Sequence, residues 1–212
     1  ELPWSVPADN RPAQHRTTPL KVTDSEQRLT VSGADFDYTF NKADGQLCSM
    51  KYMGAELLKQ GARFNVWRAP LANEVDDWTL GAVSIYPQSD GYGRMVAAAW
   101  YSIGLDKMRP RLESFQVENK AENTIVTVRE IVLFGNAGNG GFENIMVYTI
   151  SPDGEINLHH TINPNGRMPM YLPRIGTEWI LDDQMQNVEW FGRGPQENYP
   201  DRKTGYRIGL YH

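Results

Sequence analysis

The chain has 212 residues, which is enough for one large domain or two small ones. Its 21 Lys and Arg residues against 26 Asp and Glu residues give a net charge of −5, and no basic cluster is present, which argues against a nucleic-acid partner. No apolar stretch approaches the length of about 18 residues that a membrane span needs. The single cysteine, Cys48, excludes an internal disulfide and a zinc site built on cysteine pairs.

The first half of the sequence starts with a proline-rich stretch and continues with strand patterns. Residues 1–22 contain four prolines and little periodicity, which is typical of an extended linker. Aromatic residues alternate with polar ones over residues 36–40, a turn is predicted at Asp44-Gly45, and residues 47–53 are predicted to return as the second arm of a hairpin. Residues 72–110 are irregular, with one short helix predicted at about 94–107 from the helical spacing of its apolar residues.

The second half is predicted to consist almost entirely of strands. Residues 124–134 are apolar on much of both faces, which indicates a strand in the centre of its sheet. Residues 136–141, rich in Gly and Asn, are predicted to be a flexible loop. Further strands are predicted at 145–151, 155–162, 173–181 and 187–191, with a hairpin turn at Pro152-Asp153-Gly154. The predicted class is all-β, with two packed antiparallel sheets.

Motifs for nucleotide binding and for nucleophilic catalysis are missing from the sequence. There is no GxxxxGK[ST] loop and no GxSxG elbow. Cys48 is interpreted as a small apolar filler within a hairpin strand. The four histidines have no zinc-site spacing, and His159 and His160, as neighbours on a strand, would point to opposite faces. The sequence therefore predicts no metal site.

An acidic segment follows Arg68-Ala69-Pro70-Leu71. Glu74, Asp76 and Asp77 crowd oxygen ligands beside Trp78, and such a group can hold calcium. The DxDxDG spacing of a calcium loop is absent, so a solvated turn or a pairing with an arginine is favoured.

The most unusual string is WFGRGPQENYPDR at residues 190–202. Two glycines and two prolines restrict its backbone, and it concentrates guanidinium, carboxylate, carboxamide and phenol groups. Sugar recognition uses such groups because hydroxyls need fixed donors and acceptors beside an aromatic surface. An interlocked turn uses them as well, with Arg193 or Arg202 paired to Glu197 or Asp201 and bonded to loop carbonyls. The residues alone favour the structural turn and leave sugar binding open.

Three segments together resemble a known family. GRGPQENYPDR at 192–202, residues 64–73 around RAPLAN and the hairpin 36–53 are similar to signatures of the LacZ-type β-galactosidases of glycoside hydrolase family two. The resemblance covers about residues 24–212. It implies that residues 1–23 are a linker and the tail of a preceding immunoglobulin-like domain. It also implies that residues 24–212 are the N-terminal portion of the small-chain module, a large antiparallel supersandwich of the galactose mutarotase type that would be incomplete at its C-terminus.

The resemblance also implies a division of labour with other domains. Retaining hydrolysis uses two carboxyl groups, and in this family both, with the magnesium and most sodium ligands, lie on a TIM barrel. The expected role of this chain is therefore non-catalytic, with no cofactor of its own, shaping the active-site rim and domain assembly in an enzyme that hydrolyses lactose-like β-galactosides. Its partners would be the other domains and, through the whole enzyme, the substrate. Homo-oligomerisation and a bacterial cytoplasmic or periplasmic location stay open.

One departure from the family pattern affects the expected site. Ala72 stands where the family commonly has an acidic residue after RAPL, which puts substrate preference in question. The alternative functions are a carbohydrate-binding module acting alone and a mutarotase-type epimerase, for which His160 and Glu178 are the candidate acid and base. The candidate carbohydrate contacts are Asn73, Glu74, Asp76, Asp77, Arg193, Glu197, Asn198, Tyr199 and Asp201. The candidate structural loop residues are Arg68, Pro70, Gly194, Pro195, Gln196 and Arg202.

Overall fold

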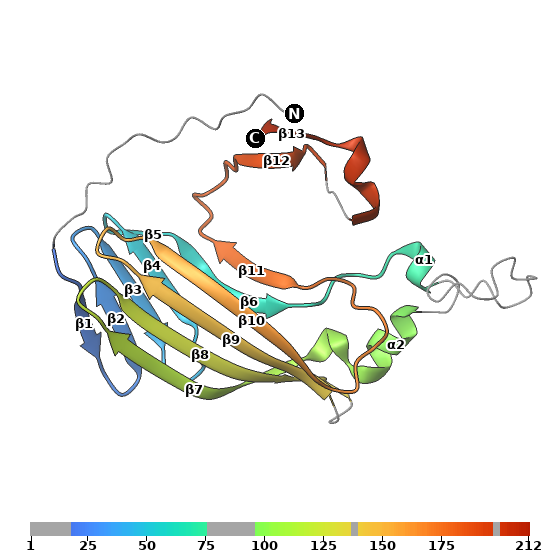
Figure 1. Cartoon of the computed structure of the whole chain (residues 1–212), viewed down its shortest axis with the longest axis horizontal. Helices are drawn as coiled ribbons and strands as arrows, with labels where there is room; N and C mark the ends of the chain where they lie inside the picture. The colour runs from blue at the N-terminus through green and yellow to red at the C-terminus, as the bar shows by residue number, and fades with distance from the viewer. Residues whose placement is uncertain (1–17, 76–95, 137–139, 197–199) are drawn as a thin grey trace, which may run out of the picture.

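The computed structural model describes residues 18–75, 96–136, 140–196 and 200–212. Two antiparallel sheets form its main body (Figure 1). The five-stranded sheet has the order β1-β2-β3-β4-β5, with strands Lys21–Asp24, Arg28–Ser32, Phe36–Asn41, Leu47–Tyr52 and Ala55–Glu56. The four-stranded sheet has the order β10-β9-β8-β7, with strands Ile156–Gly166, Gly140–Ile150, Thr124–Leu133 and Arg109–Asn119.

Alternation of buried and exposed residues explains why the two sheets pack face to face. Every second residue of β3, from Phe36 to Phe40, is buried, and the same alternation runs along β8 and β9. The inward side chains meet in one apolar cluster that includes Leu29, Phe40, Val126 and Tyr148. The all-β antiparallel sandwich predicted from the sequence is confirmed, with residues 124–134 in an interior strand as expected.

A second apolar cluster lies at one end of the sandwich, where the helices are. Helix α2 (Val96–Ile103) and the 3₁₀ helix η1 (Leu105–Lys107) are joined by Gly104 in the left-handed conformation, with φ of 74°. The Trp100 side chain is 1% exposed and packs with Val132 and Phe142 of the four-stranded sheet and with Phe134, which directly follows β8. The helix predicted near 94–107 is therefore confirmed over its described part.

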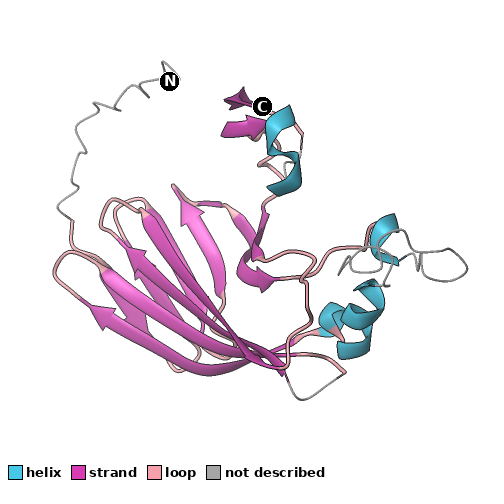
Figure 2. Cartoon of the chain, turned by 45° about the vertical axis from the view of Figure 1, so that its right-hand side comes forward, coloured by secondary structure: helices cyan, strands magenta, loops and turns pink. Residues whose placement is uncertain are grey.

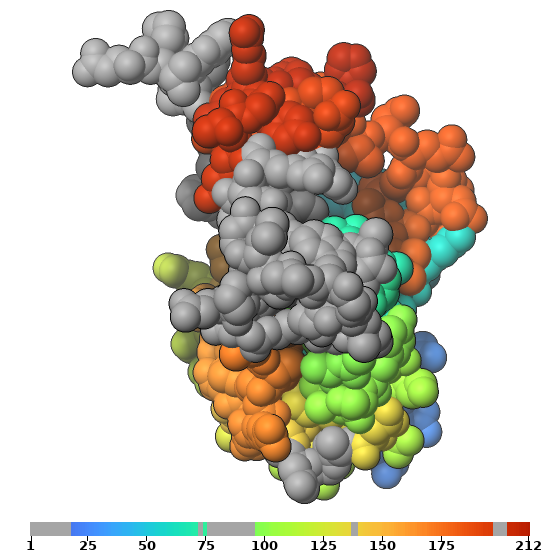
Figure 3. Space-filling model, turned by 90° about the vertical axis from the view of Figure 1, so that its right-hand side faces the viewer, coloured from blue at the N-terminus to red at the C-terminus, as the bar shows by residue number. Residues whose placement is uncertain are grey.

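Two further strand pairs extend from the sandwich. Strand β6 (Leu58–Asn65) pairs with β11 (Gly176–Leu181), and β12 (Trp190–Gly194) pairs with β13 (Arg207–Tyr211). The short helix α1 (Ala72–Val75) follows β6, and the 3₁₀ helix η2 (Pro200–Gly205) lies between β12 and β13. The β12–β13 pair stands apart from the main sandwich (Figures 1 and 2), and Figure 3 shows it at the opposite end of one face from α2.

The structure corrects part of the predicted loop 136–141. Residues 137–139 lie outside the described residues, but Gly140 and Gly141 belong to strand β9. A Cβ atom on Gly141 would lie 2.1 Å from the carbonyl oxygen of Val132 on β8, so the close approach of two backbones requires glycine there. At the other end of the chain, β1 begins at Lys21 and crosses the predicted boundary between residues 23 and 24.

Candidate functional site

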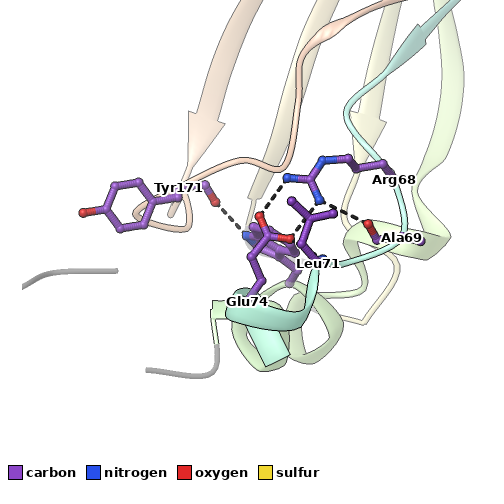
Figure 4. A network of polar contacts seen from close by, with 6 residues as sticks. Arg68, Ala69, Leu71, Glu74 and Tyr171 are labelled. Carbon is purple, nitrogen blue, oxygen red and sulfur yellow. Dashed lines mark hydrogen bonds and ion pairs between the residues drawn. The ribbon is translucent and has the colours of Figure 1, made fainter. Parts of the chain in front are cut away.

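Arg68 and Glu74 form a clamp that closes the segment between β6 and α1 (Figure 4). The guanidinium donates two hydrogen bonds to the carboxylate, from Nη1 to Oε2 at 2.8 Å and from Nη2 to Oε1 at 2.7 Å. The same carboxylate accepts the backbone N–H of Leu71 at 2.7 Å, and Arg68 also donates to the carbonyl of Ala69 at 3.1 Å. Parallel double bonding of this kind fixes the orientation of both groups as well as their separation.

The electrostatics of the clamp favour the charged form of Glu74. The hydrogen bond from Arg68 lowers the pKa of the Glu74 carboxyl, the Leu71 N–H and the guanidinium charge add to this, and partial burial opposes it. Both side chains are only 18% exposed, so water competes weakly for the pair. Glu74 thus pairs with an arginine and fixes the RAPLAN segment as a turn, while Asp76 and Asp77 lie outside the described residues.

The region behind the clamp ties this turn to the second core. The indole Nε1 of Trp100, on α2, donates a hydrogen bond of 2.7 Å to the carbonyl of Tyr171. Figure 4 shows that carbonyl beside the Arg68–Glu74 pair. The rings of Trp67 and Tyr101 also pack together, with centroids 5.3 Å apart, and α1 contacts α2. Three segments far apart in the sequence, around residues 67–74, 96–103 and 171, therefore meet at this end of the molecule.

Arg193 performs a similar function in the unusual loop after β12. Its Nη1 atom donates to the carbonyl of Lys203 at 2.9 Å and to the carbonyl of Tyr206 at 3.0 Å. The indole of Trp190 donates to the Arg193 carbonyl at 3.3 Å, and the Gly194–Pro195 peptide bond is cis. In the described residues the Arg193 guanidinium binds backbone carbonyls, which are the partners expected of an interlocked turn.

The remaining residues predicted for the two loops are distributed as follows. Gly194 is buried, and a Cβ atom there would lie 2.7 Å from the Tyr211 ring, so the position leaves no room for a side chain. Pro195 and Gln196 are exposed. Asn73 belongs to α1 and Asp201 and Arg202 to η2, with their side chains outside the described part of the structure. Pro70 lies within the clamped turn. Five predicted contacts lie outside the described residues: Asp76, Asp77, Glu197, Asn198 and Tyr199.

A buried polar network that the sequence analysis missed crosses the inner face of the four-stranded sheet. Asn144 is fully buried and Glu130 is 5% exposed, and the Asn144 Nδ2 donates to Glu130 Oε2 at 2.8 Å. The Asn144 Oδ1 lies 2.5 Å from the Nε2 of His160, whose Nδ1 lies 2.8 Å from the Thr177 hydroxyl. Glu130 occupies an inward position between Val128 and Val132, and that alternation is the signal that could have found it.

Burial shifts the two titratable groups of this network in opposite directions. Desolvation raises the pKa of the Glu130 carboxyl, although hydrogen bonds from Asn144 and Gln46 oppose the shift. Desolvation lowers the pKa of the His160 imidazole. Both groups are therefore shifted toward their neutral forms.

The two residues considered for epimerase chemistry have separate partners. His160 contacts Asn144 and Thr177, whereas Glu178 accepts a hydrogen bond of 2.7 Å from Asn65 and lies 3.7 Å from the Arg174 guanidinium. No described contact joins the His160 ring to the Glu178 carboxylate. The described residues also contain no group of three His, Cys, Asp or Glu side chains that could hold a metal ion. None of the helices in the described ranges is long and apolar enough to cross a membrane.

The fold and the two tied loops define a class of protein: an all-β sandwich module whose arginines fix surface turns. A comparison with family models matches residues 32–212 to the family described as beta galactosidase small chain. The chain belongs to this family, which confirms the resemblance drawn from the sequence motifs.

Comparisons with curated proteins agree with this assignment. The chain is 30% identical over 192 residues to a beta-galactosidase of Priestia megaterium and 31% identical over 201 residues to one of Psychromonas ingrahamii. It is 28% identical over 221 residues to a beta-galactosidase of Kluyveromyces lactis. These alignments cover 91%, 90% and 100% of this chain but only 16%, 18% and 19% of the relatives. The chain thus spans less than a fifth of the length of these relatives.

Proposed function

We propose that the chain is a non-catalytic module of a β-galactosidase of glycoside hydrolase family two that hydrolyses terminal β-D-galactosides with retention. Its role in that enzyme is to hold turns at the active-site rim and against neighbouring domains. The support for the activity is the similarity to relatives named beta-galactosidase, each several times longer than the chain.

One observation carries the proposed structural role. The bidentate Arg68–Glu74 pair fixes the turn that leads into residues 76–95, with both partners largely withdrawn from solvent. A free surface loop gains little from such an ion pair, because exposed pairs contribute about 0–1 kcal/mol. A bidentate pair that is mostly shielded from solvent instead holds a loop in one conformation. A rim that contacts another domain or a substrate needs such a fixed conformation.

The partners and ions of the proposed enzyme lie beyond this chain. The catalytic carboxyl groups and the magnesium and sodium sites are proposed to be on other domains of the same polypeptide, as the resemblance to the LacZ-type family implies. The β-galactoside is proposed to be a partner of the whole enzyme, and lactose catabolism is its proposed metabolic use.

The test compares the 212-residue chain with the longest natural polypeptide that contains it, using a nitrophenyl β-D-galactoside. The long polypeptide is expected to release nitrophenol and to give the β-anomer first by NMR, because retention proceeds through two displacements. The 212-residue chain is expected to be inactive. Equal turnover by the two would contradict the proposed non-catalytic role, and no turnover by the long polypeptide would contradict the proposed enzyme.

The rim role has its own test in the long polypeptide. Glu74→Gln removes the charge that the Arg68 clamp requires, and a misplaced rim turn is expected to lower kcat/KM about tenfold or more. Glu113→Gln is the matched control, because Glu113 forms an exposed ion pair with Arg111 on β7. Equal kcat/KM values for both variants and the unmodified enzyme would refute the rim role.

A further inference from the structure

A pocket with polar and apolar lining residues opens beside the buried network, between the β3–β4 turn and strands β6, β7 and β8. Its volume is about 580 Å³. Residues from four separate segments line it, which makes it a property of the tertiary fold and not of one loop. It is separate from both the Arg68–Glu74 turn and the Arg193 loop, and neither arginine is among its lining residues. A pocket of this size accepts a molecule of up to drug-like dimensions.

The polar wall of the pocket contains hydrogen-bonding capacity that the fold leaves unused. Gln46 lines the pocket, and its buried Oε1 atom has no donor among the described residues. Its Nε2 atom reaches Glu130 Oε1 at the long distance of 3.4 Å. Buried polar atoms without partners are uncommon in folded proteins, so this acceptor suits a donor such as a ligand hydroxyl.

The charges around the pocket are nearly balanced. Arg63, on β6, is exposed at the pocket, and its guanidinium makes no hydrogen bond or ion pair with a described residue. Two carboxyl groups line the pocket, that of Asp44 from the β3–β4 turn and that of Glu130, whose pKa is raised by burial toward the neutral form. Arg111 is already paired with Glu113. A balanced site with both donors and acceptors suits a neutral polar ligand better than an anion or a cation.

Apolar side chains supply the rest of the lining. Phe64, Leu112 and Val132 face the same cavity as Gln46, Arg63 and Glu130. An apolar wall opposite several hydrogen-bonding groups matches a pyranose, which has C–H faces and a rim of hydroxyls.

We propose that this pocket binds a neutral polyhydroxylated molecule of monosaccharide size. The Arg63 guanidinium donates a hydrogen bond to one ligand hydroxyl, and Gln46 Oε1 accepts a hydrogen bond from another. Phe64 and Leu112 contact its C–H face. The proposal does not rest on the proposed function, because the pocket is formed entirely by this chain.

Hydrogen exchange followed by mass spectrometry tests the proposal on the longest natural polypeptide that contains this chain. D-galactose and D-glucose are the probes, at about 100 mM, which saturates a site with a Kd of about 1 mM. We expect protection of peptides covering residues 43–46, 63–64 and 108–112. Arg63→Ala and Gln46→Ala are each expected to raise the sugar concentration that gives half-maximal protection about tenfold, since each removes one hydrogen bond to the ligand.

Arg129→Ala is the control variant. Arg129 lies on β8 next to Glu130 but on the outer face of the sheet, where it pairs with Glu143. It is expected to leave the sugar dependence unchanged. No protection of the pocket peptides by either sugar would overturn the proposal. Protection by inorganic phosphate but by neither sugar would overturn it as well, because the ligand would then be an anion. Hydrolysis of the nitrophenyl galactoside is measured separately, so failure here leaves the proposed enzyme intact.

Discussion

Replacing Glu74 with Gln is the sharpest test of how the RAPLAN turn is held. The carboxylate accepts two hydrogen bonds from the Arg68 guanidinium and one from the Leu71 N–H. A carboxamide can keep one acceptor in place, so one charge-assisted hydrogen bond is lost and the guanidinium keeps no counter-charge. With both side chains 18% exposed, we expect a loss of about 2 kcal/mol, between the cost of breaking a buried pair and that of an exposed one.

Urea denaturation of the 212-residue chain measures this loss. With a slope of about 2 kcal/mol per molar urea, a loss of about 2 kcal/mol lowers the midpoint by about 1 M. Glu113→Gln breaks an exposed ion pair and is expected to change stability by less than about 0.5 kcal/mol. If the Glu74→Gln midpoint moves no further than that of Glu113→Gln, the clamp does not hold the fold as argued.

The pH dependence of stability gives a second measure of the same pair. The pKa of Glu74 is lower in the folded chain than its ordinary value of 4.5. Its contribution is therefore fully present above pH 4.5 and is lost as pH falls through the lowered folded pKa. Glu74→Gln is expected to flatten the stability profile in that acid range, and a profile parallel to the unmodified chain would contradict the assignment.

Three further predictions concern the core and the buried network. Gly141→Ala is expected to lower the free energy of unfolding, measured with urea, by about 3 kcal/mol, because its Cβ would meet a backbone carbonyl at 2.1 Å. The control Gly176→Ala, where a Cβ has open space, is expected to lower it by less than about 1 kcal/mol. Trp100→Ala is expected to cost about 4 kcal/mol and to remove near-UV circular dichroism from the second core; an unchanged midpoint would show that this cluster does not stabilise the chain. The pKa of His160 is below its ordinary value of 6.5 in the folded chain. Its contribution to stability is therefore present above pH 6.5 and is lost as pH falls through the folded pKa. If stability depends on pH with the same slope in His160→Gln, this assignment is wrong.

The sequence predicted the strands with a strong apolar pattern, whether that pattern alternates or covers both faces. The alternation at Phe36, Tyr38 and Phe40 located one hairpin, and the apolar run at 124–134 located an interior strand. Strand β7, at Arg109–Asn119, was not predicted, because it lies at the edge of its sheet and none of its residues is fully buried. Gly140 and Gly141 were assigned to a loop, because composition cannot distinguish a glycine that frees the backbone from one that lets two strands approach.

Side-chain partners were harder to predict than elements. The sequence analysis named an arginine pairing as one option for the acidic segment, and Arg68 and Glu74 lie only six residues apart. Composition could not decide between sugar hydroxyls and loop carbonyls as partners of Arg193, since both accept the same N–H groups. The contact between Glu130 and Asn144 depends on the register of β8 against β9, which pairs these two residues directly across the strands, and the sequence does not state that register.

The position of Glu130 gives the buried network a meaning within the whole fold. Along β8, Val128 belongs to the main apolar cluster and Val132 to the helical one, so the carboxyl group lies between the two cores. An apolar residue there would join the clusters, and exchanging buried polar groups for apolar ones is often neutral or stabilising. Stability alone therefore does not explain the polar layer. Its hydrogen bonds fix the register of three strands at the point where the pocket opens, so the arrangement of Gln46 and Arg63 relative to Glu130 is set before any ligand arrives.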